Sequence, residues 1–93
     1  MIQNAELLEF FEEQYRRGGS RRSIRLGDRL YDDLAIDSLF ASELLVALED
    51  RFDLELLHDP RMWMVATVGE LFDRARTIDV EKQRTPIAAE SAA

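Results

Sequence analysis

The chain has 93 residues, no cysteine and a formal net charge of −7, so we expect one small domain without disulfide bridges or thiolate metal sites. No apolar run approaches the ~20 residues that span a membrane, and the N-terminus lacks a signal-peptide pattern. These features predict a soluble, cytoplasmic monomer with no membrane partner.

The charge is unevenly distributed along the chain. Residues 16–30 contain six arginines and one aspartate, whereas residues 32–59 contain nine carboxylates and one arginine. The acidic block argues against nucleic acid and for a partner with a basic surface, although it also fits a solvated helix face. The basic stretch lacks interleaved aromatic residues and lies in a predicted loop, so we expect no nucleic-acid partner.

One apolar stripe with helical spacing predicts a first helix over residues 4–17: Leu7, Leu8, Phe11 and Tyr15. Gly18-Gly19 is expected to end this helix. Residues 18–36 then form a long connection, and loops of this length in compact domains are usually held down or functional. The apolar side chains expected to hold it across the core are Ile24, Leu26, Leu30, Tyr31, Leu34 and Ile36.

A second helix is predicted over residues 38–52. Asp37 supplies the short acceptor side chain of a helix N-cap, which makes Ser38 the first helical residue. A phosphate ester on Ser38 would lie at a helix end that favours anions, although serine is also common there as a simple capping-region residue. The stripe expected to be buried, and to dominate the stability, is Ala41, Leu44, Leu45, Leu48 and Phe52.

Two further helices are predicted after residue 58. Asp59-Pro60 indicates the start of a short third helix, with an acceptor at the cap and proline at the first position. Its large side chains, Met62, Trp63, Met64 and Val65, are most simply core. Thr67 and Glu70 form a capping box for a fourth helix that should end near Ile78. The domain would then cover residues 1–79, and residues 80–93 would be a disordered tail.

The residue pattern does not favour an enzyme. A serine hydrolase needs a base beside its nucleophile, but the single histidine, His58, lies in a predicted loop far from Ser38. A calcium loop beginning at Asp32 would place Leu34 and Ile36 where oxygen ligands belong. We therefore expect neither catalytic residues nor a metal site.

A set of short motifs resembles the acyl carrier proteins over about residues 28–72: Asp32-Asp33-Leu34, Asp37-Ser38-Leu39, Glu43-Leu44, Ala47-Leu48-Glu49 and Phe52-Asp53. The resemblance implies an all-α fold, a four-helix bundle with three longer helices, a short third helix and a long first loop. It also implies that Ser38, flanked by Asp37 and Leu39, carries a 4′-phosphopantetheine arm derived from coenzyme A. The arm would hold acyl groups as thioesters.

The resemblance further implies which surfaces partners and cargo use. The expected partners are a phosphopantetheinyl transferase and an acyltransferase, ketosynthase or ligase with a basic docking surface. The residues expected to be recognised by partners are Phe40, Glu43, Glu49 and Asp50. In this family the second and third helices wall a cavity for the acyl chain, for which the candidates here are Leu48, Met62, Met64 and Val65.

Two departures from the family pattern bear on the pathway. Ala35 stands where glycine is usual, and Phe40 stands where fatty-acid carriers tend to have an acidic residue. An exposed aromatic residue beside the arm favours a polyketide-type or related secondary-metabolite carrier. The alternatives are an aminoacyl carrier of such a pathway, a fatty-acid carrier, or an unmodified helical adaptor whose acidic second helix binds a basic partner.

Overall fold

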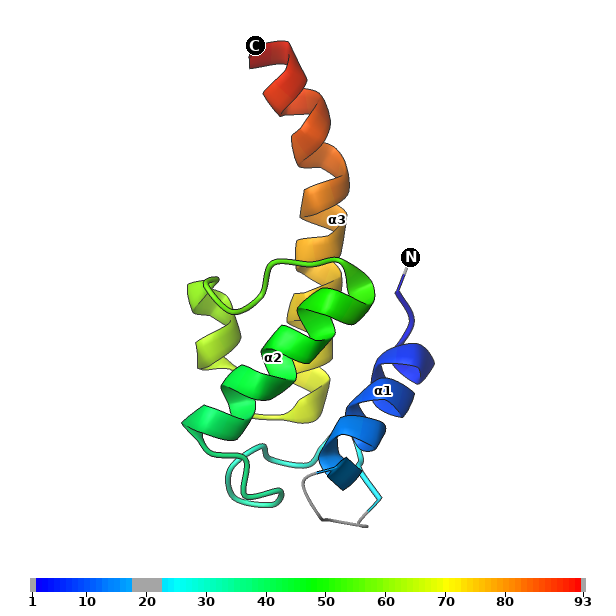
Figure 1. Ribbon diagram of the computed structural model, residues 1–93, viewed down its shortest axis with the longest axis vertical. Helices are drawn as coiled ribbons and strands as arrows, with labels where there is room; N and C mark the ends of the chain where they lie inside the picture. The colour runs from blue at the N-terminus through cyan, green and yellow to red at the C-terminus, as the bar shows by residue number, and fades with distance from the viewer. Residues whose placement is uncertain (1, 18–22, 93) are drawn as a thin grey trace.

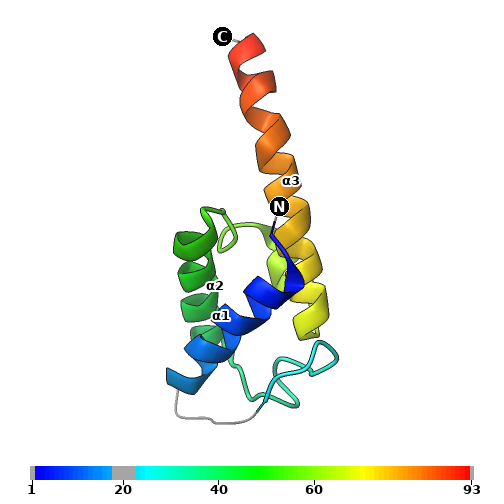
Figure 2. The same cartoon turned by 90° about the vertical axis from the view of Figure 1, so that its right-hand side faces the viewer.

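The computed structural model describes residues 2–17 and 23–92, with side chains described as far as Lys82. This part of the chain is all-helical and contains no strand. Its elements are α1 (Asn4–Arg17), α2 (Ser38–Phe52), the 3₁₀ helix η1 (Pro60–Met64) and α3 (Val68–Ala92). Helix α1 packs against α2, and η1 packs against α3 (Figures 1 and 2). Within the described residues, no helix combines the length and apolar character needed to cross a membrane.

The predicted all-α class is confirmed, as are the bounds of α1 and α2 and the starts of η1 and α3. Each start follows a local signal. Asp37 and Asp59 accept hydrogen bonds from Phe40 N and Arg61 N, and Thr67 Oγ1 accepts one from Glu70 N at 3.2 Å. The expected helix stop at Gly18-Gly19 lies outside the described residues.

Helix α3 is longer than predicted. It continues to Ala92 rather than ending near Ile78, and its second half extends past the rest of the molecule (Figure 1). Two ion pairs stabilise the turn after Ile78, one from Glu81 to Arg61 and one from Lys82 to Asp53. Residues 80–92, assigned by sequence to a disordered tail, have helical backbone here. Disorder of residues 80–93 in solution remains a prediction from the sequence.

The core forms where the three α-helices and the first loop meet. Its largest fully buried side chains are Phe11, Phe72, Leu7, Leu48, Leu56 and Val68. The rings of Phe11 and Phe72 meet edge to face with centroids 5.8 Å apart, a geometry worth ~0.5–1.5 kcal/mol beyond the burial itself. Leu44, Leu45 and Leu48 of the predicted α2 stripe are buried as expected.

The loop over residues 23–37 is held by side chains and by its own backbone. Ile24, Leu34 and Ile36 are buried, and the Tyr15 hydroxyl donates a buried hydrogen bond of 2.8 Å to the Leu34 carbonyl. Leu26 and Tyr31, which we expected to hold the loop, are exposed. The loop is held instead by backbone hydrogen bonds to Ala66 and to the first two residues of α3: Leu30 N to Ala66 O at 2.9 Å, Val68 N to Asp28 O at 3.0 Å and Gly69 N to Leu26 O at 2.8 Å.

The loop leads into α2 through a residue whose backbone has the left-handed conformation. Ala35 has a φ of 55°, and its N–H donates to the Tyr31 carbonyl at 2.9 Å. A residue with a Cβ in this conformation costs roughly 1–2 kcal/mol, whereas glycine adopts it freely. Ala35 is therefore strained, and it lies two residues before Asp37, the N-cap of α2.

Replacing this alanine should stabilise the protein. Ala35→Gly should raise the free energy of unfolding by up to about 1 kcal/mol, because the relieved strain exceeds the added freedom of the unfolded chain. Ala47→Gly, inside α2, should lower it by about 1 kcal/mol. Urea denaturation of both variants measures the two changes. A loss of stability in Ala35→Gly would show that residue 35 is not left-handed in solution.

Candidate functional site

Ser38 lies at the exposed start of α2. The Asp37 carboxylate accepts a hydrogen bond from Phe40 N at 2.9 Å, and the Asp37 carbonyl accepts one from Ala41 N at 2.8 Å. The Ser38 carbonyl accepts a hydrogen bond from the Ser42 hydroxyl at 2.9 Å. The predicted cap is thus confirmed, and it fixes the backbone of Ser38 while leaving this residue open to solvent.

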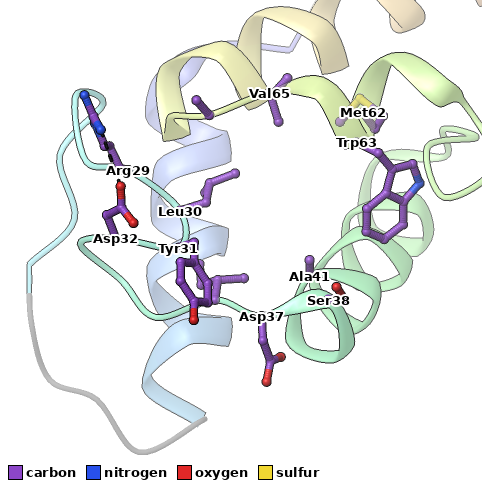
Figure 3. A pocket seen from close by; sticks show the side chains of 12 residues that line it. Arg29, Leu30, Tyr31, Asp32, Asp37, Ser38, Ala41, Met62, Trp63 and Val65 are labelled. Atoms are coloured by element: carbon purple, nitrogen blue, oxygen red, sulfur yellow. Dashed lines mark hydrogen bonds and ion pairs between the residues drawn. The ribbon is translucent and has the colours of Figure 1, made fainter.

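A groove of about 420 Å³ opens beside Ser38 (Figure 3). We call it the Ser38 groove. Its walls come from the start of α2, the first loop, η1 and the short segment after η1. The lining residues are Arg29, Leu30, Tyr31, Asp32, Ile36, Asp37, Ser38, Ala41, Met62, Trp63, Val65 and Ala66. The volume falls within the usual range of small-molecule sites, roughly 300–1,000 Å³.

A second and much smaller cavity lies deeper in the molecule. This inner void measures about 30 Å³, enough for roughly two or three water molecules. Its lining is apolar: Phe11, Leu30, Ile36, Ala41, Leu44, Leu45, Met62, Trp63 and Leu71. Five of these residues also line the Ser38 groove, namely Leu30, Ile36, Ala41, Met62 and Trp63. The same side chains therefore wall both spaces.

The structure places the four acyl-pocket candidates differently. Met62 and Val65 line the Ser38 groove, and Met62 also lines the inner void. Leu48 is buried in the core and lines neither space, and Met64 is 82% exposed and lines neither.

Sequence reasoning missed several groove residues. Tyr31 and Ile36 come from the loop, and their place depends on hydrogen bonds with the distant segment before α3. Ala41 had a usable signal, because it lies three residues after Ser38 and therefore on the same face of the helix.

The partner-recognition candidates on α2 fall into two groups, one exposed to solvent and one in contact with other parts of the protein. Glu43 and Asp50 are exposed, together with Leu39 (70%) and Val46 (41%). Positions 39, 43, 46 and 50 have spacings of three and four, so they share one face of the helix. We call these four residues the outer face of α2.

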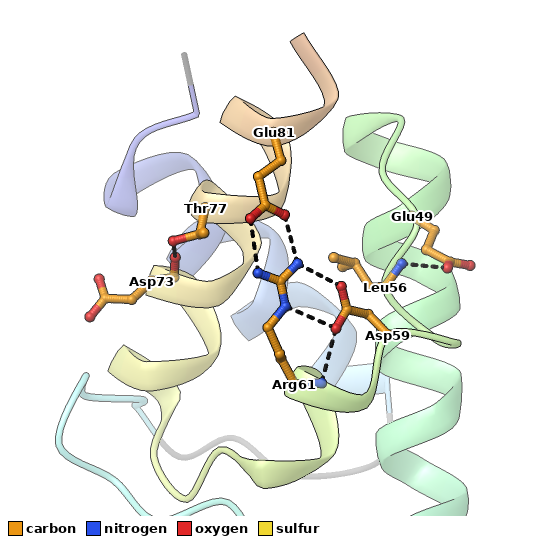
Figure 4. Close-up of polar contacts among 7 residues, drawn as sticks. All are labelled: Glu49, Leu56, Asp59, Arg61, Asp73, Thr77 and Glu81. Carbon is orange, nitrogen blue, oxygen red and sulfur yellow. Dashed lines mark hydrogen bonds and ion pairs between the residues drawn. The ribbon is translucent and has the colours of Figure 1, made fainter. Parts of the chain in front are cut away.

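Glu49 and Phe40 are engaged within the protein. The Glu49 carboxylate accepts a hydrogen bond from Leu56 N at 2.7 Å (Figure 4) and a second one from Leu57 N at 2.9 Å. It therefore holds the loop that follows α2. The Phe40 ring is half-buried rather than exposed, and it stacks on Tyr15 with centroids 5.9 Å apart.

The groove wall on η1 is held by a charged cluster of Asp59, Arg61 and Glu81. The Arg61 guanidinium contacts Glu81 through Nη1 at 3.0 Å and Nη2 at 2.7 Å, and Asp59 through Nη2 at 2.8 Å (Figure 4). These hydrogen bonds hold the pKa of both carboxyl groups below their ordinary values and raise the pKa of Arg61. The Trp63 indole N–H also donates to the Leu57 carbonyl at 2.9 Å.

Comparison of the chain with protein-family models, curated proteins and solved structures found no match. In the part of the chain that the structure describes, no group of three histidine or carboxylate side chains is placed to hold a metal ion. The function must therefore be inferred from the sequence motifs and from the geometry around Ser38.

The charged cluster should make stability fall in acid. Because the folded pKa values of Asp59 and Glu81 lie below 3.8 and 4.5, both groups stabilise the fold above those values. That contribution is lost as the pH falls through the folded pKa values. Arg61→Met should lower the Tm near neutral pH by a few degrees and should reduce the further loss on acidification to about pH 3.

The matched control for this prediction is Arg17→Met. It removes the same charge from an exposed pair with Glu13 on α1, and exposed pairs contribute little. The fall of its Tm on acidification should follow that of the wild type. Identical acid losses in Arg61→Met and the wild type would mean that the cluster does not form in solution.

Proposed function

We propose that this protein is an acyl carrier protein, with the acyl-carrier four-helix arrangement in which η1 is the short third helix. Ser38 would carry 4′-phosphopantetheine and hold acyl groups as thioesters. The observation that carries the proposal is the exposed Ser38 in the Asp37-Ser38-Leu39 context, at the first residue of α2 and on the wall of a groove large enough for a small ligand.

The chemistry requires no catalytic group on this chain. The Ser38 hydroxyl oxygen would attack the β-phosphorus of coenzyme A, so that an O–P bond forms and the pyrophosphate P–O bond breaks. Adenosine 3′,5′-bisphosphate would leave, and a base of the transferase would take the hydroxyl proton. The resulting phosphodiester would lie at the N-terminus of α2, where the helix dipole favours negative charge. His58 lines a different surface hollow from Ser38, which supports a serine that a separate enzyme modifies rather than one that a base of this chain activates.

The outer face of α2 is the proposed docking surface. It combines two exposed carboxylates with two exposed aliphatic side chains, so it would fit a partner with basic residues around an apolar contact. The partners would be the transferase and an acyltransferase, ketosynthase or ligase. Glu49 is an unsuitable contact because backbone N–H groups already occupy its carboxylate.

The proposed pathway is polyketide or related secondary-metabolite synthesis. The stack of Phe40 on Tyr15 removes the argument that an exposed ring favours such a pathway. What remains is the lack of an acidic residue at position 40. An aminoacyl carrier and a fatty-acid carrier use the same arm on the same serine. An unmodified adaptor would bind its partner through the outer face of α2 and would carry no phosphopantetheine arm.

The first experiment tests the attachment. Incubated with coenzyme A and a phosphopantetheinyl transferase of broad specificity, the wild type should gain the mass of one arm. Ser38→Ala should gain none, because the attacking oxygen is gone. Ser42→Ala, one turn along the same helix, should be modified like the wild type. Intact-protein mass spectrometry gives the result, and circular dichroism checks that all three fold. An unmodified wild type would contradict the carrier proposal and favour the adaptor.

A second experiment tests the docking surface. Glu43→Lys should slow transfer of the arm at low salt by about three- to tenfold, since it reverses a charge near Ser38, and the difference should shrink at high salt. Glu13→Lys makes the same change on the exposed surface of α1 and should have little effect. Initial rates at low carrier concentration measure both. Equal slowing by the two variants would show that net charge, not the outer face of α2, guides the partner.

A further inference from the structure

A separate hollow lies between α1 and α2, and it shares no lining residue with the Ser38 groove. It measures about 250 Å³, and we call it the α1–α2 hollow. Its lining residues are Gln14, Arg17, Phe40, Glu43 and Leu44. Leu44 is buried and Phe40 is half-buried, so these two side chains form an apolar floor. The other three residues are polar or charged.

Glu43 connects this hollow to the outer face of α2. It lines the hollow and also belongs to the row of exposed residues at positions 39, 43, 46 and 50. An enzyme that docks on the outer face would therefore lie directly beside the hollow. Gln14 and Arg17 would then add α1 to the docking surface.

The uncompensated charge at the hollow is negative. The Arg17 guanidinium lies 3.6 Å from the Glu13 carboxylate, so these two charges largely offset one another. The Glu43 carboxylate forms no ion pair or hydrogen bond with the residues that the structure describes. A cationic side chain of a partner would therefore be attracted, whereas an acidic one would be repelled by Glu43. An apolar side chain would cover the carboxylate without replacing its hydrogen bonds to water.

The chemistry of the lining favours arginine over lysine. A guanidinium is planar, stacks on aromatic rings and presents several N–H donors in a fork that fits a carboxylate. The hollow offers an aromatic ring at Phe40, a carboxylate at Glu43 and an amide oxygen at Gln14. A lysine ammonium is a compact and strongly hydrated point charge, so it would gain from Glu43 but less from the ring and the amide.

We propose that the α1–α2 hollow receives an arginine side chain of the enzyme that docks on the outer face of α2. Glu43 pairs with the guanidinium, Phe40 contacts its plane, and the Gln14 amide oxygen accepts one of its N–H groups. This inference rests on the proposed function for the identity of the partner. It makes α1 part of the docking surface and assigns to Phe40 and Gln14 the choice of arginine over lysine.

The first test titrates the unloaded full chain, at constant ionic strength, with blocked tripeptides that hold arginine, lysine or glutamate between two alanines. The arginine tripeptide should shift the NMR signals of the Gln14 side-chain amide and the Leu44 methyl groups. Its dissociation constant should be about two- to fivefold smaller than that of the lysine tripeptide, the gain expected from an exposed contact between a guanidinium and an aromatic ring. The glutamate tripeptide should shift neither signal.

Two variants separate the effect of the charge from that of the ring. Glu43→Gln should weaken binding of the arginine and lysine tripeptides alike, because it removes the carboxylate charge. Phe40→Leu should make the two dissociation constants equal, because it removes the aromatic ring. Glu9→Gln removes the same charge as Glu43→Gln from an exposed position of α1 outside the hollow and should bind like the wild type. Circular dichroism checks folding, and Gln14→Ala gives a second test of the arginine preference if Phe40→Leu does not fold.

A second test asks whether a docking enzyme uses the hollow. Gln14→Ala should raise the KM of a phosphopantetheinyl transferase of broad specificity for this protein by about two- to tenfold, the effect of one lost hydrogen bond. The kcat should stay unchanged, because the contact serves docking rather than the transfer at Ser38. Gln3→Ala makes the same change at an exposed position before α1 and should alter neither constant.

Several results would overturn the proposal. Equal binding of the arginine and lysine tripeptides to the wild type would show that the hollow responds to charge alone. Tighter binding of the glutamate tripeptide would show that Arg17 dominates the hollow. An unchanged KM in Gln14→Ala would show that the enzyme docks without using α1. A Ser38 that is modified, in a protein without arginine preference, would defeat this inference alone, whereas an unmodified Ser38 with arginine preference would defeat the carrier proposal and the identity of the partner.

Discussion

Backbone hydrogen bonds join the first loop to Ala66 and to the first residues of α3, and they determine the geometry around Ser38. Leu30 N bonds to Ala66 O, and Val68 N and Gly69 N bond back to Asp28 O and Leu26 O. The loop carries one wall of the Ser38 groove and delivers Asp37 to the cap of α2, whereas the segment before α3 carries the opposite wall. The approach is close, since a Cβ on Gly69 would lie 3.1 Å from the Leu26 carbonyl oxygen. A side chain there would push these two segments apart.

Sequence reasoning placed the helix starts well because their signals are local. Asp37, Asp59 and Thr67 each accept a hydrogen bond from an N–H two or three residues further on, so composition and spacing are enough to find them. The end of α3 could not be found in this way. The turn of α3 that follows Ile78 makes contacts between Arg61 and Glu81, 20 residues apart, and between Lys82 and Asp53, 29 residues apart. Contacts between residues so far apart produce no periodic pattern in the sequence.

The candidate site was predicted in part for the same reason. Ser38 and its cap follow from neighbouring residues, but the groove depends on which distant segments meet. Phe40 looked exposed because its stacking partner, Tyr15, belongs to another helix. Glu49 did leave a signal. It lies four residues after the buried Leu45, so helical spacing turns it toward the protein, whereas Glu43 faces outward.

The position of η1 determines one wall of the Ser38 groove. Water weakens the exposed ion pairs of Arg61, so they orient this short helix more than they stabilise it. Burying a methionine is worth ~1.5–3 kcal/mol, and Met62 is the one buried residue of η1. The side chain that contributes most to holding η1 therefore also lines both the Ser38 groove and the inner void. Loss of the Met62 side chain would therefore weaken both the packing of η1 and one wall of the Ser38 groove.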